Sequence, residues 1–259
     1  MLLLRTCLYY KKILSYKLNW NNTIRLIQPK ERRQRRDSLS CLIHSINQQE
    51  RINYQSIESE VMDDLPLLRL TSNILSKSTH SLQEIHICLS SQLHAQLYTT
   101  LSCLNTQLIH LSVRDTTCDS KRTVTSANAC QLPLFQSQST LQTLDIPTFP
   151  SHELCAHLYR FPKLKSLTIA LSHDIRWDQF KYMFPNPIDI TLVLTHLNQL
   201  VFVRSLLSDP SLFPWFKRLS ITSHEPLKQF ISKEELKSSV SRLEGLYRIT
   251  AGWDIIALS

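Results

Sequence analysis

The segment His152-Glu-Leu-Cys-Ala-His157 is the candidate for metal chemistry in this sequence. A zinc-protease helix needs two histidines at positions i and i+4, because that spacing places both imidazoles on one face. Here the spacing is i to i+5, which rotates the second ring by roughly 140° around a helix. We therefore predict no metal site and interpret both histidines as surface residues of a helix.

Glycine, which many catalytic loops require, is nearly absent: Gly245 and Gly252 are the only two in 259 residues. Dinucleotide fingerprints, phosphate-binding loops and nucleophile elbows all need glycine where the backbone turns sharply or approaches a ligand. A Ser-His-Asp hydrolase also needs an oxyanion hole that no segment here suggests. The sequence therefore predicts a protein that is not an enzyme, with no catalytic residue and no cofactor.

Positive charge is concentrated in the first quarter of the chain. The formal net charge is +8, and residues 1–60 contribute +6 of it, from 11 Lys/Arg and 5 Asp/Glu. Arg32, Arg33, Arg35 and Arg36 form a basic cluster that suits phosphate binding or nuclear import. The simpler interpretation of this cluster is a solvated linker. The alternative function is therefore that of a nucleic-acid-associated protein that uses the four arginines.

The cysteine content indicates a reducing compartment. The seven cysteines are odd in number and include no Cys-x-x-Cys, so they suggest neither a disulfide framework nor a zinc module. We expect the cytoplasm or nucleus, with mitochondrial import of the basic N-terminal segment as a weaker alternative. No apolar run approaches the roughly 18 residues of a membrane span, and we expect no membrane association.

The elements that would position binding residues come from a recurring pattern, Leu-x-x-Leu-x-Ile and close variants. Its six copies begin at Leu65, Leu82, Leu108, Leu141, Leu164 and Phe216. An alternating apolar stretch at 188–194 and a degenerate copy at 243–249 complete eight units, which are about 25 residues apart on average. A short strand that returns at this interval predicts a solenoid rather than a closed globule.

The segments between these strands carry apolar residues three or four positions apart, which predicts helices. They are 93–104, 154–161, 180–184, 200–207 and the segment opened by a capping box at 232–235. A strand and a helix in each unit place parallel strands on one face and helices on the other. The predicted fold class is α/β, a right-handed solenoid of irregular repeats with strands on the concave face and helices on the convex face.

The array resembles the leucine-rich repeat family, in the ribonuclease-inhibitor-like arrangement common in F-box proteins. The copy Leu65-Pro-Leu-Leu-Arg-Leu-Thr-Ser-Asn73-Ile-Leu75 follows the longer family pattern, including the Asn of the turn. The resemblance covers residues 65–258. It is also similar to F-box/leucine-rich-repeat receptors, although residues 1–60 contain no clear F-box. This similarity implies a scaffold that recognises substrates for a ubiquitin ligase.

The sequence therefore predicts three regions. Residues 1–28 are expected to form a basic amphipathic helical segment, because apolar positions recur every three or four residues. Residues 29–60 are expected to be a basic and polar linker. Residues 61–259 are expected to form the leucine-rich-repeat domain.

The side chains that alternate with the strand leucines should share the face opposite the helices, because strand neighbours point to opposite faces. They are Glu84, His86, His110, Ser112, Thr143, Asp145, Ser166, Thr168, Arg218 and Ser220. Solenoids commonly bind partners on this face, so we predict a protein partner there, with a solvated sheet face as the simpler alternative. The row has no aromatic residue on which bases would stack, which disfavours single-stranded nucleic acid.

Overall fold

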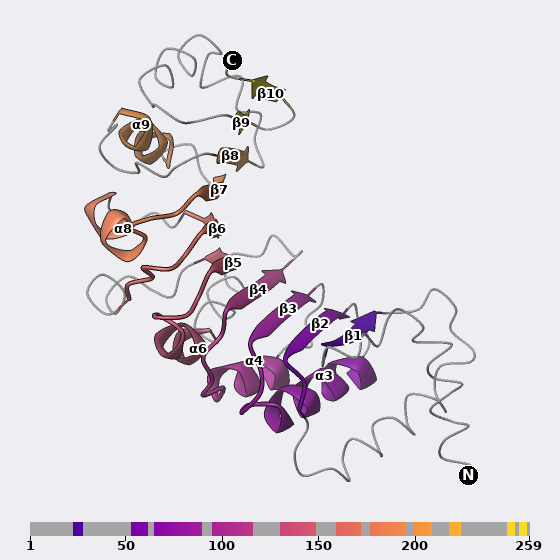
Figure 1. Ribbon diagram of the computed structural model, residues 1–259. Helices are drawn as coiled ribbons and strands as arrows, with labels where there is room; N and C mark the ends of the chain where they lie inside the picture. Colours follow the sequence, from indigo (N-terminus) through magenta and orange to yellow (C-terminus); the bar gives the residue numbers. More distant parts are fainter. Residues whose placement is uncertain are drawn as a thin grey trace, which may run out of the picture. The chain divides into compact units, whose positions relative to one another are not determined.

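The computed structural model describes residues 23–27, 53–61, 65–89, 95–115, 130–148, 159–171, 177–194, 199–208, 218–223, 248–251 and 254–257. The chain divides into two units, Met1–Gln136 and Ser137–Ser259. Each unit contains a parallel β-sheet with helices packed beside it (Figure 1). The predicted α/β class with parallel strands is therefore confirmed.

The first unit contains parallel strands that pair in the order of the sequence. They are β1 (Thr23–Ile27), β2 (Ser56–Val61), β3 (Glu84–Leu89) and β4 (His110–Asp115). The helices of this unit lie on one side of the sheet (Figure 1). They are α3 (Leu65–Lys77), α4 (Ala95–Ser102) and α6 (Gln131–Gln136).

The second unit repeats this order of pairing from β5 to β9, and β10 then pairs antiparallel with β9. Its strands are β5 (Thr143–Thr148), β6 (Ser166–Ala170), β7 (Asp189–Leu194), β8 (Arg218–Ser223), β9 (Arg248–Ala251) and β10 (Asp254–Ala257). Its described helices are α8 (Trp177–Met183) and α9 (Leu200–Ser208). The antiparallel end at β10 differs from the parallel array that the sequence predicts.

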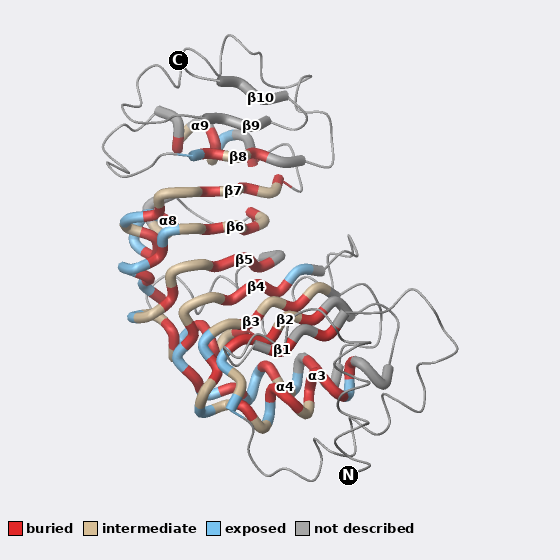
Figure 2. Tube along the Cα trace, turned by 45° about the vertical axis from the view of Figure 1, so that its right-hand side comes forward, coloured by how far each residue is buried: buried red, intermediate tan, exposed pale blue. Residues whose placement is uncertain are grey.

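Alternating burial explains why these segments form strands. In β6, Leu167 and Ile169 are fully buried, whereas their neighbours Ser166 and Thr168 are half-buried. Figure 2 shows buried and intermediate positions along β6. Each buried Leu or Ile stabilises the fold by about 1.5–3 kcal/mol. The copies that begin at Leu82, Leu108, Leu141, Leu164 and Phe216 place their last two apolar residues on strands of the sheet, as predicted.

A shared backbone carbonyl connects one strand to the next at the start of several strands. The carbonyl oxygen of Gln83, for example, accepts hydrogen bonds from the backbone N–H of Ile109, at 2.7 Å, and of His110, at 3.2 Å. The carbonyls that accept two such bonds belong to Gln55, Gln83, Gln142 and Lys165. Strands β3, β4, β6 and β7 therefore begin with the same pair of backbone hydrogen bonds, whether the acceptor residue is Gln or Lys.

The first predicted copy is wrong, because residues 65–77 form helix α3 and not a strand. Leu68, Thr71 and Leu75 are separated by three and four residues and are all buried, which is the spacing of a helix face. Pro66 is the second residue of this helix, where a missing N–H breaks no helical hydrogen bond. The segment that best follows the family pattern, including Asn73, is therefore helical.

The strand that precedes α3 is β2, which lies inside the predicted linker at 29–60. Its buried face carries Ile57 and Ser59, and Ser59 Oγ forms a 3.0 Å hydrogen bond with Thr71 Oγ1 of α3. Strand β1 likewise lies inside the predicted helical segment 1–28, where Ile24 and Leu26 are buried. The helical prediction is wrong for these five residues, and the sheet begins before the predicted boundary at residue 61.

The helices predicted from apolar residues three or four positions apart are partly confirmed. Helix α4 buries Leu97 and Leu101, and α9 buries Val203 and Leu206. In α8, Phe180 packs edge-on against Phe184, which follows the helix. The predicted helix at 154–161 is wrong at its end, because residues 159–161 are not helical; 151–158 and the capping box at 232–235 lie outside the described residues.

An aromatic cluster in the core of the second unit explains why residues 159–161 are not helical. Phe161 is fully buried and stacks on Phe184, with ring centroids 5.7 Å apart. The backbone N–H of Phe161 donates a 2.8 Å hydrogen bond to the carbonyl of Met183, the last residue of α8. Residues 159–161 therefore pack against the end of α8 and do not continue a helix.

Candidate functional site

The face opposite the buried leucines carries rows of polar side chains, one from each neighbouring strand. In the first unit Glu84 of β3 stands opposite His110 of β4, and His86 stands opposite Ser112. Glu84 Oε1 lies 3.8 Å from His110 Nε2, and these two side chains are 40% and 32% exposed. They therefore form an ion pair when the imidazole is protonated, at a place that a partner can reach.

Strand β2 extends these rows by one position. Glu58 stands opposite His86, and Ser56 stands opposite Glu84. Neighbouring strands are roughly 4.8 Å apart, so the rows bring acidic and imidazole groups of three strands within one contact surface. The polar face of this unit therefore offers charges of both signs and hydrogen-bond donors and acceptors.

The second unit has an equivalent row at the start of its strands. Thr143 stands opposite Ser166, Ser166 opposite Asp189, and Asp189 opposite Arg218. The Arg218 guanidinium donates two hydrogen bonds to the Asp189 carboxylate, one from Nε and one from Nη2. These bonds and the charge of Asp189 raise the pKa of Arg218 above its ordinary value, so the guanidinium remains charged.

A second row in this unit consists mainly of hydroxyl groups. Asp145, Thr168, Thr191 and Ser220 occupy matching positions on β5, β6, β7 and β8. Asp145 is 8% exposed, although it belongs to the polar face. The row presents one carboxylate followed by donors and acceptors at the regular spacing of the strands.

All ten predicted contact residues lie on described strands, next to buried apolar residues, and two of them, Ser112 and Asp145, are themselves buried. The structure places Glu84 and His110 in contact, whereas Arg218 and Ser220 are separated from β6 by β7. The basic cluster Arg32, Arg33, Arg35 and Arg36 lies outside the described residues.

The further residues of these rows include Ser56, Glu58, Asp189 and Thr191. The alternation of Ile188, Ile190 and Leu192 in the sequence contains the signal for Asp189 and Thr191, because they stand between these apolar residues. Glu58 has no comparable signal, since β2 reads Ser-Ile-Glu-Ser-Glu-Val and lacks the leucine pattern.

The described cysteines do not point to redox or metal chemistry. Cys88, Cys103 and Cys130 form no disulfide, and no group of three His, Cys, Asp or Glu side chains suited to a metal ion occurs within the described ranges. Burial raises the pKa of the Cys130 thiol to about 12, which keeps this group protonated and unreactive at neutral pH. Cys130 is therefore a small core residue.

Comparison of the chain with protein-family models, with curated proteins and with solved structures gives no match. In the part of the chain that the structure describes, no helix combines the length and apolar character needed to cross a membrane. The assignment of a function therefore depends on the geometry of the polar rows.

Proposed function

We propose that this protein is a non-enzymatic scaffold whose polar sheet face binds a protein partner. The observation that carries the proposal is the register of the rows, because polar side chains from successive strands align opposite one another across each sheet. Such rows arise when strand–helix units stack, and stacked units use this surface to bind extended partners.

The proposal includes a leucine-rich-repeat solenoid, right-handed, with the polar rows on its concave face. The parallel order of the strands and the buried leucine positions of β3, β4, β5, β6 and β8 support it. The recurring shared carbonyls support it further, because they repeat the same local geometry from strand to strand.

A protein partner fits the chemistry of the face better than a nucleic acid does. The rows contain the acidic residues Glu58, Glu84 and Asp189, the basic residue Arg218, and several Ser and Thr residues. Mixed charge with many hydroxyls suits the polar and charged groups of a protein surface, whereas nucleic acid demands a concentration of positive charge. Recognition of ubiquitin-ligase substrates is the more specific form of this proposal, and its support is the resemblance of the repeats to F-box receptors.

A photo-crosslinking experiment tests the proposal. A photoreactive phenylalanine analogue replaces Thr168 on the polar face of β6, and a second variant carries it at Val201, which is exposed on α9. We expect a discrete protein adduct in cells from the Thr168 variant and none from the Val201 variant. Equal adducts at both positions, or adducts at Val201 alone, would contradict the proposed binding face. A ubiquitin-ligase subunit in the purified complex would support the more specific form.

A further inference from the structure

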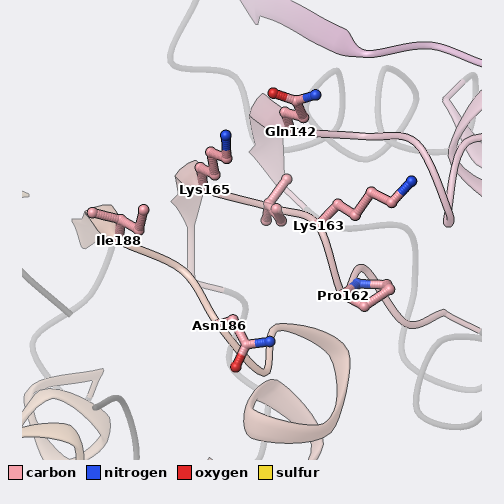
Figure 3. Close-up of a pocket in the computed structure, with 7 residues that line it drawn as sticks. Gln142, Pro162, Lys163, Lys165, Asn186 and Ile188 are labelled. Carbon is pink, nitrogen blue, oxygen red and sulfur yellow. The ribbon is translucent and has the colours of Figure 1, made fainter. Parts of the chain in front are cut away.

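A pocket of about 370 Å³ lies at the edge of the second sheet where β5, β6 and β7 begin. Gln142, Lys165 and Ile188 each stand immediately before one of these strands. Lys163, Pro162 and Asn186 complete the rim (Figure 3). The pocket is therefore built from three chain segments that the parallel sheet brings together, and it lies beyond the polar rows.

The charge of the pocket is positive. Lys163 and Lys165 are both exposed, and neither forms an ion pair with any residue that the structure describes. The described lining contains no acidic residue. Figure 3 shows the amide of Gln142 and the amino groups of both lysines on one side of the pocket. These groups are spread along that side and provide donors for separate anionic oxygens.

The remaining lining is apolar. Pro162 and Ile188 contribute to the rim, and Leu164, which lies between the two lysines, is buried at its base. The methylene chains of the lysines add further apolar surface, because such chains lie along apolar groups while the ammonium stays in water. A ligand that complements this pocket has an apolar side chain next to a carboxylate.

We propose that this pocket binds a short acidic segment of the protein partner, in which a leucine-like side chain adjoins glutamate or aspartate. The apolar residue enters between Pro162 and Ile188, and the neighbouring carboxylates accept hydrogen bonds from Lys163, Lys165 and Gln142. A phosphate backbone fits less well, because the lining has two cations and no aromatic side chain for base stacking. The inference rests on the proposed role in protein binding and names the chemistry of the partner.

Fluorescence anisotropy of the full chain with a labelled peptide tests this inference. The probe carries Glu-Leu-Glu between Gly-Ser flanks, and its controls carry Gln-Leu-Gln or Glu-Ser-Glu in the same place. We expect Lys163→Glu and Lys165→Glu each to weaken binding by about fivefold or more, since one exposed charge contact contributes about 1 kcal/mol. Replacement of the peptide leucine by serine should weaken binding by roughly tenfold.

Lys181→Glu is the matched control, because Lys181 is exposed on α8, changes the charge equally and does not line the pocket. It should alter the affinity by no more than about twofold at physiological salt, where distant charges are screened. Circular dichroism and melting confirm that each variant is folded, and Lys163→Gln and Lys165→Gln repeat the test without a new negative charge.

Two outcomes overturn the inference: equal effects of the pocket and Lys181 substitutions, or equal binding of the Gln-Leu-Gln peptide. Single-stranded RNA that binds more tightly than the peptide through the same lysines would assign the pocket to nucleic acid instead. The crosslinking experiment at Thr168 uses a different surface. A failed peptide assay with intact crosslinking therefore rejects only the pocket, and the opposite result rejects only the polar face.

Discussion

Arg218 of β8 lies directly opposite Asp189 of β7, and its guanidinium donates one hydrogen bond to each carboxylate oxygen. Two parallel hydrogen bonds fix the orientation of both groups. The Arg218 side chain is nevertheless 66% exposed, so water screens the attraction and the pair adds little to the free energy of unfolding. The pair instead holds the Arg218 guanidinium in a fixed orientation on the polar face.

Arg218→Ala should therefore reduce partner binding without a measurable change in melting temperature. The crosslinking yield from the photoreactive group at Thr168 measures the binding, and differential scanning fluorimetry measures the stability. Arg160→Ala is the control, since Arg160 is an exposed arginine that lies over the Tyr182 ring and away from the rows. A loss of yield in the control as large as that in Arg218→Ala would contradict the assigned role.

Two neighbouring residues of β6 should differ sharply in their effect on stability. Leu167 is fully buried, so Leu167→Ala should lower the free energy of unfolding by about 2–5 kcal/mol, and Leu167→Asp should unfold the second unit. Thr168→Ala, on the polar face, should change it by about 0.5 kcal/mol or less. Urea denaturation followed by circular dichroism checks both values; similar losses would mean that the strand register is wrong.

The hydrogen bond between Ser59 and Thr71 connects β2 with α3 inside the first unit. Ser59→Ala and Thr71→Val should show a coupling energy of about 0.5–1.5 kcal/mol in a double-mutant cycle, because both hydroxyls are buried. The exposed Ser76, on the same helix, is the control and should show no coupling with Ser59. Independent effects of Ser59 and Thr71 would argue against the packing of α3 on β2.

The strands of this fold were predictable where the leucine pattern coincides with burial. Leu111 and Val113, or Leu144 and Ile146, alternate strictly and lie on strands. The copy at Leu65 failed because the same segment also carries Leu68, Thr71 and Leu75 at the three- and four-residue spacing of a helix face. Strand β2 was not predicted because its buried face contains Ser59, whose hydroxyl forms a hydrogen bond with Thr71, a partner that local sequence does not reveal.

The candidate sites were predictable to different extents for a similar reason. The polar rows follow from alternation, which is a local property, and the predicted residues lie on described strands. The pairing of Asp189 with Arg218 depends on which strands are neighbours, across 29 residues of sequence. The pocket depends on Gln142, Lys165 and Ile188 meeting at one edge, which no single segment encodes.

Cys130 should make the fold less stable in alkaline solution. Its folded pKa, about 12, is above the ordinary value of 9.0, so the unfolded thiol loses its proton first and stability falls as the pH rises from about 9 to about 12. Urea denaturation at pH 8 and pH 10 should show a smaller decrease for Cys130→Ala than for the unchanged protein. Equal decreases would show that the thiol is not buried in solution.

Thiol labelling gives a second measure of the same residue. At neutral pH Cys103, which is exposed, should react with a thiol reagent much faster than Cys130 does, and urea should remove the difference. Mass spectrometry of the labelled peptides identifies each site. Rapid labelling of Cys130 in the folded protein would contradict its place in the core.

The alternative function, nucleic-acid binding through the basic cluster, predicts an affinity that depends on salt concentration. If Arg32, Arg33, Arg35 and Arg36 bind single-stranded RNA, their replacement by Ala should reduce the slope of log affinity against log salt by about 3. Filter binding across a range of salt concentrations measures this slope. RNA binding that is absent, or insensitive to salt, would reject the alternative.

The carbonyls of Gln55, Gln83, Gln142 and Lys165 join successive strands through main-chain atoms alone. The side chains at these four positions carry none of that bonding, so glutamine and lysine occur at equivalent points without altering the sheet. At this edge, main-chain atoms hold the strands together, and the side chains are left to contact a ligand. Substitutions along it would leave these backbone bonds in place, and they would alter the proposed ligand contacts while the strands stay paired.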